Sequence, residues 1–313
     1  MALSAAVDLS PTSAFYRWRQ RHFRQAHEHA WFVKDARTEA LIRSELARYA
    51  YAIELHESGA LIPEPLYQRL HFRWDKAHRE RLEALLAEQA FTLPCGKRIE
   101  PTTDGVRLSM LRQLTSGFIY ANGCEDRSDD VCSDTSACHW LSQARIRALS
   151  DCVDGVQGPV LVAAFFRAEV DALLSHFGGK AKALNGQTPA AERSKLIDAW
   201  NRDAIEVLIG VPAAMGHGIN LQHGSCRTLI WYTHSFDWAQ RAQMNARLIR
   251  AGQTKTVSII DMVADQGIDV PVLHALEKKK AGEAAMFEAI KAAQGKAAPP
   301  TSASVPSTSG AVR

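Results

Sequence analysis

Short apolar runs alternate with helical stretches along the second half of the chain, and this alternation restricts the fold more than any other feature. Strand-like runs occupy residues 159–166, 181–184, 205–211, 227–232 and 255–262. Helices are expected over residues 168–177, from Thr188 to Trp200, from Asp237 to about Ile249, and from about 269 to 293. Strands that alternate with helices form a parallel sheet covered on both faces. The sequence therefore predicts an α/β fold with a parallel sheet of about five or six strands.

The first half of the chain has a different texture and predicts mainly helices. Helical periodicity covers Ala14–His29, Arg37–Ile53 and Asp75–Phe91, and a further helix is expected up to Tyr120. Residues 123–137 are polar and acidic, which is typical of a surface loop and places a domain boundary at its end. We therefore divide the chain into three regions: 1–137, mainly helical; 138–294, the sheet domain; and 295–313, a disordered tail rich in Ala, Pro, Ser and Thr.

Composition excludes several classes of protein. The formal net charge of +3 is mildly basic, so it permits nucleic-acid binding without arguing for it. No run approaches the roughly 20 apolar residues of a membrane span, so no membrane association is expected. The N-terminus lacks a basic lead and meets Asp8 at once, which is unlike a secretory signal and predicts a cytoplasmic protein.

A group of cysteines raises the question of a metal site. Cys124, Cys132, Cys138 and His139 lie near one another in sequence, but none of the six cysteines forms a Cys-x-x-Cys pair. Structural zinc sites draw their ligands from such close pairs. We therefore favour a polar loop with incidental thiols and predict no metal-ligating residues, with a zinc site as the alternative.

The segment after the strand at 205–211 carries two closely spaced glycines, Gly216 and Gly218, followed by Asn220. Ligands of open parallel sheets bind beyond the carboxyl ends of the strands, where this segment lies. Glycines allow the backbone to approach a phosphate or another loop closely, and the Asn220 side chain could form a hydrogen bond across a cleft. A tight strand-to-loop turn explains the same residues equally well.

The predicted helix from Asp237 carries the second feature. Gln243, Arg247 and Arg250 stand at i, i+4 and i+7, which places an amide and two guanidinium groups on one helical face. Paired guanidiniums suit a polyphosphate because each can hold oxyanions with two donors. The alternative is an ordinary solvated basic face.

Together and in this order, the two features resemble a known family. Gly-x-Gly-Ile-Asn-Leu-Gln, an apolar strand and then Gln-x3-Arg-x2-Arg-x-Gly-Gln resemble motifs V and VI of superfamily-two helicases, and more narrowly of the Swi/Snf-type DNA translocases common in bacteriophages and bacteria. Residues 160–174, 184–200 and 111–120 resemble further segments of the same proteins. The resemblance covers about residues 10 to 293 and implies that 138–294 is a RecA-like helicase C-terminal domain, preceded by the helical material between two motor lobes.

The resemblance also implies roles for the residues at the nucleotide. Arg250 would be the main arginine finger, reaching the γ-phosphate of ATP, with Arg247 as its partner and Gln243 as a positioning residue. Gly216, Gly218 and Asn220 would bind the nucleotide side of the cleft and couple it to DNA. In the family a His stands between the two arginines, and here that position is Ile249.

On the DNA side, the resemblance implies that Asn185, Gln187, Thr188 and Arg193 lie toward the backbone of a DNA duplex. Amide and hydroxyl groups at such positions contact phosphates without reading the base sequence.

The family's phosphate-binding loop and acidic box are missing from these residues. A Gly-Lys pair occurs at 96, 179 and 295, but none has the spacing Gly-x4-Gly-Lys-Ser/Thr, and no Asp-Glu-x-His box is present to hold Mg²⁺. The resemblance therefore predicts a second motor lobe that uses ATP and Mg²⁺ only with a first lobe from a separate polypeptide, on double-stranded DNA. The alternatives are a non-catalytic remnant that binds DNA or protein, and an enzyme that uses Gly216 and Gly218 in a Rossmann-like way.

Overall fold

The computed structural model describes residues 14–27, 30–47, 62–87, 90–120, 138–215 and 219–294. Backbone contacts divide the chain into two compact units, one of residues 55–280 and one that combines residues 1–54 with 281–313. The predicted loop at 123–137, the predicted tail at 295–313, and Gly216 and Gly218 lie outside the described residues.

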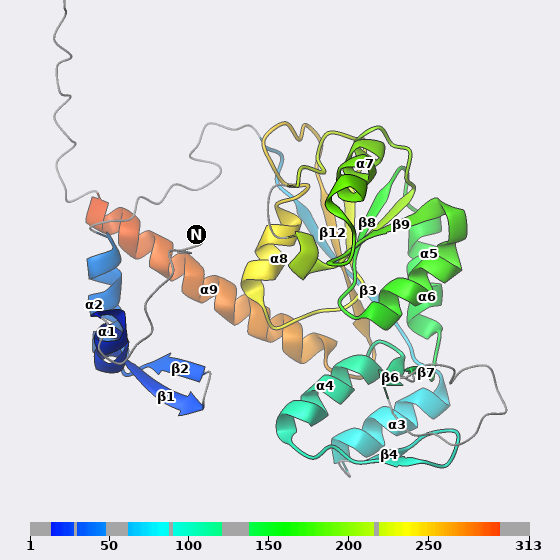
Figure 1. Cartoon of the computed structure of the whole chain (residues 1–313), viewed down its shortest axis with the longest axis horizontal. Helices are drawn as coiled ribbons and strands as arrows, with labels where there is room; N and C mark the ends of the chain where they lie inside the picture. Colours follow the sequence, from blue (N-terminus) through cyan, green and yellow to red (C-terminus); the bar gives the residue numbers. More distant parts are fainter. Residues whose placement is uncertain are drawn as a thin grey trace, which may run out of the picture. The chain divides into compact units, whose positions relative to one another are not determined.

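A six-stranded sheet in which every pairing is parallel forms the centre of the larger unit (Figure 1). Its order is β3-β12-β11-β8-β10-β9. The strands are β3 (Leu66–Phe72), β8 (Val160–Ala163), β9 (Ala181–Leu184), β10 (Val207–Gly210), β11 (Thr228–Trp231) and β12 (Ser258–Ala264). The predicted α/β class and parallel sheet are confirmed.

Five of these strands match the predicted apolar runs, whereas β3 was not predicted. β3 lies at the edge of the sheet and pairs only with β12 among the described strands. Most of its residues are exposed, so its sequence, Leu-Tyr-Gln-Arg-Leu-His-Phe, contains no continuous apolar run. The sheet therefore takes one strand from the region that the sequence had indicated to be mainly helical.

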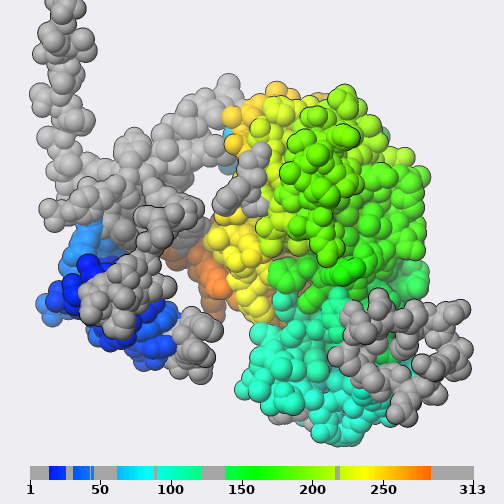
Figure 2. Space-filling view, in the orientation of Figure 1, coloured from blue at the N-terminus to red at the C-terminus, as the bar shows by residue number. Residues whose placement is uncertain are grey.

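Helices cover both faces of the sheet, and alternate strand residues face opposite sides. Val160 and Val162 belong to one buried apolar cluster, which includes residues of α5 (Ala144–Asp154), α6 (Arg167–Phe177) and the first turns of α9 (Asp269–Gln294). Leu161 and Ala163 belong to the other, with residues of α7 (Ala190–Asn201), α8 (Trp238–Asn245) and the 3₁₀ turn η3 (Pro212–Met215). A second 3₁₀ turn, η2 (Gly178–Lys180), leads into β9. Figure 2 shows the α7 and α8 segments, in green and yellow, on the face toward the viewer.

In the sequence, two helices and two short antiparallel strand pairs lie between β3 and α5. They are α3 (Lys76–Ala87), α4 (Asp104–Leu114), the pair β4 (Phe91–Thr92) and β5 (Arg98–Ile99), and the pair β6 (Phe118–Tyr120) and β7 (Cys138–Trp140). The helix predicted up to Tyr120 ends at Leu114. Gly117 has φ +97°, and a Cβ there would lie 2.4 Å from the carbonyl oxygen of Ser142, so this tight turn into β6 requires glycine.

A buried arginine joins this inserted region to the sheet domain. Arg145 of α5 is fully buried and pairs with Asp269 of α9 at 2.9 Å. Its guanidinium also donates to the carbonyls of Thr115 and Tyr232. One side chain therefore fastens α5, α9, β11 and the end of α4 together.

The smaller unit contains α1 (Ala14–His22), the antiparallel pair β1 (Phe23–His27) and β2 (Ala30–Val33), and α2 (Ala36–Ala47). The helix predicted over Ala14–His29 is therefore too long. Residues 23–27 form β1 instead, and the hairpin brings Trp31 over Arg19, whose guanidinium lies 4.2 Å from the ring centroid. Among the described residues, no helix is long and apolar enough to cross a membrane.

Candidate functional site

The loops that follow β9 and β10 meet at the carboxyl edge of the parallel sheet, where ligands of such folds bind. Arg193 of α7 ties the two loops together. Its Nη2 donates to the carbonyl of Asn185 after β9 at 3.1 Å, and its Nη1 donates to the carbonyl of Ala214 in η3 at 2.9 Å. One guanidinium therefore links two predicted site segments. One is the loop at residues 185–188, predicted to lie toward DNA. The other is the segment at residues 212–221 that carries the two glycines, called the glycine loop below.

The Asn185 loop is a turn held by its own side chains. Asn185 Oδ1 accepts from the backbone N–H of Gln187 at 2.9 Å, and Thr188 Oγ1 accepts from the N–H of Asn185 at 3.1 Å. Thr188 therefore belongs to this turn and not to the helix predicted from Thr188 to Trp200, and Pro189 is the N-cap of α7. Gln187 is exposed, so its amide is available to an outside partner.

The segment after the two glycines is fixed at three successive carbonyls. Each accepts a hydrogen bond from a side chain of another element: residue 219 from Arg247 Nη1 (3.0 Å), residue 220 from Asn201 Nδ2 (2.9 Å), and residue 221 from Trp200 Nε1 (3.1 Å). The Asn220 side chain itself is exposed. The end of the glycine loop is therefore held rigidly against α7 and against the segment that follows α8.

The helix that carries the predicted arginines is shorter than expected. Asp237 is the N-cap of α8, at the predicted start of this helix, and accepts from the N–H of Gln240 at 3.0 Å. The helix ends at Asn245 rather than near Ile249, and the chain continues in tighter turns, closed by the hydrogen bonds from the N–H of Arg247 to Met244 and from that of Leu248 to Asn245. The three predicted site residues consequently do not share one helical face.

The structure separates these residues by exposure. Gln243 and Arg250 are exposed, whereas Arg247 is only 7% exposed. The prediction that both guanidiniums share one helical face is wrong for Arg247, because that side chain turns inward to the carbonyl of Ile219.

Electrostatics distinguish the two arginines further. Burial lowers the pKa of Arg247, and the positive charge of Arg250 lowers it further. The two guanidiniums are therefore close enough to repel each other. Within the part of the chain that the structure describes, the Arg250 side chain makes no hydrogen bond or ion pair. An exposed guanidinium of this kind fits the oxygens of a phosphate.

The site offers contacts to an anion but no cage for a cation. None of the predicted site residues carries a carboxylate, and the described residues contain no group of three or more His, Cys, Asp or Glu side chains that could hold a metal ion. The phosphate oxygens of a nucleotide fit Arg250, whereas a Mg²⁺ ion has no ligand set among the described residues.

Sequence reasoning missed a buried carboxylate in the first turn of α6, the helix that follows β8. Glu169 is fully buried and accepts from the N–H of Phe165 at 2.7 Å, from Thr233 Oγ1 at 2.9 Å, and from Ser116 Oγ. Burial raises its pKa above the usual range of a glutamate. Its position three residues after the helix start is the signal that could have revealed a capping glutamate.

Arg112 of α4 was also missed as a contact at this edge. Its guanidinium lies 4.1 Å from the Phe165 ring centroid and donates to the carbonyl of His234 at 3.3 Å. These contacts hold α4 against the loops that follow β8 and β11. Sequence periodicity does not predict these contacts, because they join residues more than fifty positions apart.

Comparison with protein families matches residues 144–252 to the helicase conserved C-terminal domain. Protein p41 of Acyrthosiphon pisum secondary endosymbiont phage 1 is 29% identical over 237 residues, which cover 74% of this chain and 47% of p41. The ATP-dependent helicase FUN30 of Saccharomyces cerevisiae is 31% identical over 149 residues, 45% of this chain and 13% of that protein. A zebrafish (Danio rerio) SWI/SNF-related regulator of chromatin is 34% identical over 111 residues, 35% of this chain and 11% of that protein.

Among solved structures, the C-terminal part of the Fun30 ATPase domain superposes with a TM-score of 0.50 at 16% identity, covering 69% of this chain and 90% of that one. This likeness supports the RecA-like fold. The matched stretch spans about half the length of the phage relative and far less of the eukaryotic ones.

Proposed function

Because this chain carries the C-terminal lobe of a Swi/Snf-type superfamily-two helicase, we propose that it is the second motor lobe of an ATP-dependent DNA translocase. In this role it supplies an arginine finger to a nucleotide held by a first lobe. The observation that carries the proposal is the exposed guanidinium of Arg250 next to Arg247, whose own guanidinium fixes the end of the glycine loop.

The two arginines then have different tasks. Bound ATP with Mg²⁺ supplies a phosphoryl group whose oxygens gain charge during transfer, and arginine fingers that meet this charge accelerate transfer by about 10³ to 10⁵. Arg250 contacts those oxygens. Arg247 holds the 219–221 segment in register with Arg250, and the exposed Gln243 lies on the preceding helix to help position the nucleotide.

The first lobe supplies what these 313 residues lack, namely the phosphate-binding loop and the acidic residues that hold Mg²⁺. In this proposal Gly216, Gly218 and Asn220 couple that nucleotide to the DNA side of the lobe. Arg193 transmits movement between them, since it contacts both Ala214 and Asn185.

Double-stranded DNA is the proposed track. The Asn185–Thr188 turn presents the amide of Gln187 outward, and such groups contact phosphate oxygens without sequence preference. The Arg193 guanidinium is occupied by two carbonyls, so its proposed contribution to DNA binding is to shape this turn.

ATP hydrolysis tests the proposal. The purified chain is assayed alone and mixed with a first lobe that carries Walker A and B motifs and is encoded by the same genome, with and without duplex DNA. We expect turnover only in the mixture, stimulated by DNA, and at least about 10³-fold lower with Arg250→Ala. Arg202→Ala, an exposed arginine at the end of α7, is the matched control. Full turnover by the Arg250 variant would overturn the finger assignment.

The alternative, a DNA- or protein-binding module without catalysis, gives a different result in the same experiment. No turnover would appear in the mixture. Duplex binding that weakens steeply with salt would then indicate a DNA-binding module, because salt competes with phosphate contacts.

A further inference from the structure

A cavity of about 430 Å³ lies at the β3 edge of the sheet, and none of the residues proposed to act on nucleotide or DNA lines it. Residues of β3, α8, β12 and α9 form its walls. Those that matter here are Tyr67 of β3, Trp238 and Arg241 of α8, Asp261 of β12, and Leu276 and Lys280 of α9. All of them belong to the larger unit. A volume of this size is typical of small-ligand sites.

The floor of the cavity is a buried ion pair with a spare donor. Arg241 is 6% exposed, and its Nη2 lies 2.7 and 2.9 Å from the two oxygens of Asp261. Among the described residues, Nη1 of the same guanidinium has no hydrogen-bond partner. Nη1 has less than 1 Å² of exposed area, and the guanidinium lies 4.8 Å from the ring centroid of Trp231. An unmade buried hydrogen bond is costly, so a carboxylate that draws this guanidinium toward the cavity gains that free energy on binding.

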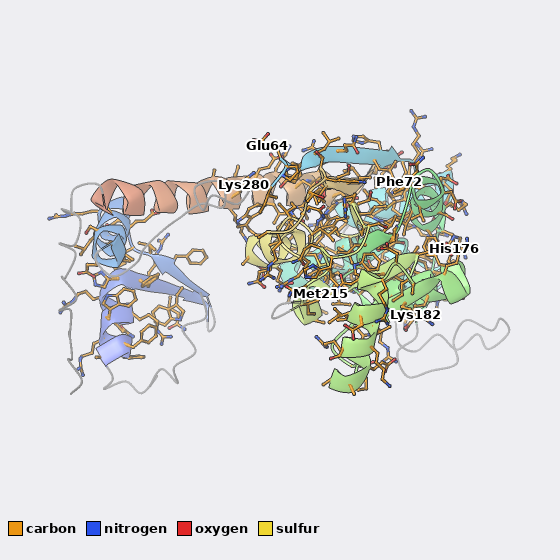
Figure 3. All side chains as sticks on the ribbon, turned by 90° about the horizontal axis from the view of Figure 1, so that it is seen from above. Glu64, Phe72, His176, Lys182, Met215 and Lys280 are labelled. Atoms are coloured by element: carbon orange, nitrogen blue, oxygen red, sulfur yellow. The ribbon has the colours of Figure 1, made fainter. Side chains whose placement is uncertain are left out.

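The walls combine aromatic surface with one uncompensated positive charge. The Lys280 ammonium lies 5.8 Å from the ring centroid of Tyr67 and 6.0 Å from that of Trp238. Figure 3 labels Lys280 on α9, near the start of β3. Within the described part of the chain Lys280 makes no ion pair, whereas the other cations of the cavity, Arg241 and Arg69, each pair with a carboxylate.

We propose that this cavity binds a monoanionic ligand with an aromatic or apolar body and one carboxylate. The body lies against the rings of Tyr67 and Trp238 and the apolar wall at Leu276. The carboxylate accepts from Nη1 of Arg241 and balances the charge of Lys280. The ligand is either a free aromatic acid or the carboxyl end of a peptide with an aromatic last residue.

Ligand-observed NMR with a matched pair of probes tests the charge requirement. The probes are 2-naphthoate and 2-naphthamide, which share one ring system and differ in the carboxylate. We expect the acid to bind the whole chain about tenfold more tightly than the amide. Equal binding of the two, or no binding of either, would overturn the proposal.

Variants then place the binding in this cavity. Lys280→Ala should weaken naphthoate binding about threefold and leave naphthamide unchanged, since Lys280 is exposed and contributes as a surface charge. Lys278→Ala, on the same helix outside the cavity, is the control and should change neither. The same loss in both variants would point to nonspecific attraction and overturn the site.

Arg241 is tested by removing its ion pair as a unit. The double variant Arg241→Met, Asp261→Leu replaces two buried charges with apolar side chains, which a fold often tolerates. We expect it to lose the preference for acid over amide while its thermal melting stays cooperative. A folded double variant that still prefers the acid would exclude Arg241 as the recognition group.

The source of the carboxylate is distinguished with a peptide pair. N-acetyl-Gly-Gly-Trp is compared with the same peptide amidated at its C-terminus. Tighter binding of the free-acid peptide than of naphthoate would indicate a peptide end, and the reverse a free aromatic acid. Both results support recognition of a carboxylate beside an aromatic ring. The proposal is rejected if the free-acid and amidated peptides bind equally and 2-naphthoate and 2-naphthamide also bind equally.

Discussion

The guanidinium of Arg247 donates a hydrogen bond to the carbonyl of Ile219 over 3.0 Å, which joins the segment after α8 to the end of the glycine loop. Arg250, three residues later, is exposed. The sequence motif suggests two equivalent arginines, but the Arg247 side chain points inward and the Arg250 side chain is exposed. The inward side chain holds a loop, and the outward one is free to meet a ligand.

This division predicts different effects on stability. Arg247→Ala leaves the Ile219 carbonyl without its donor and should lower the free energy of unfolding by about 1–3 kcal/mol. Arg250→Ala should stay within about 0.5 kcal/mol of the wild type, as exposed positions do. Urea unfolding followed by tryptophan fluorescence measures both. Similar losses in the two variants would contradict the division.

A second prediction concerns the link between the two edge loops. Lysine cannot reach both carbonyls that the Arg193 guanidinium spans, so Arg193→Lys should loosen the Asn185 turn and η3. Hydrogen exchange of the Gln187 and Met215 amides should accelerate about tenfold, which corresponds to losing one charged hydrogen bond.

The control for that experiment is Arg202→Lys, at an exposed position at the end of the same helix. It should leave exchange at both loops unchanged. If Arg193→Lys also leaves exchange unchanged, the two loops are held by other contacts and the proposed transmission through Arg193 fails.

The sheet could be predicted from the sequence because four of its strands, β8, β10, β11 and β12, are buried on both faces and appear as apolar runs, and the short edge strand β9 still begins and ends on buried apolar residues. β3 could not, since an exposed edge strand carries polar residues. The end of α8 also escaped prediction. Its last residue, Asn245, accepts a hydrogen bond from Trp231 Nε1, a partner that only the fold brings near.

For the candidate site, residue types were predictable and their orientation was not. The spacing of Arg247 and Arg250 indicated a phosphate-binding face, but the burial of Arg247 depends on a carbonyl 28 positions earlier. The clamp by Arg193 similarly rests on Ala214, 21 positions away. Local periodicity contains no information about such partners.

The pair of Arg145 and Asp269 leads to a third prediction. Both side chains are almost fully buried, so Asp269→Asn leaves a buried guanidinium without its counter-charge. We expect a loss of about 3–5 kcal/mol in the free energy of unfolding. The exposed pair of Arg167 and Asp171 gives the control, and Asp171→Asn should cost below about 0.5 kcal/mol. A loss for Asp269→Asn as small as the control's would show that the network does not depend on the ion pair.

Two buried histidines predict how stability depends on pH. Burial lowers the pKa of His78 and of His234 in the folded protein, although the nearby carboxylates of Asp75, Asp261 and Asp269 act in the opposite direction. The unfolded chain therefore takes up these protons first, near the ordinary histidine pKa of about 6.5. Stability is fully present above that pH and is lost as the pH falls below it toward the folded-state values.

Each histidine contributes a slope of up to about 1.4 kcal/mol per pH unit in this window. Urea midpoints between pH 7.5 and 5.5 measure the slope. His78→Gln, which keeps a donor toward the carbonyl of Leu114, should reduce the slope by about half, because His234 still contributes. His176→Gln, at an exposed position, should leave it unchanged. A His78→Gln variant with the wild-type slope would mean that the acid sensitivity arises from other groups.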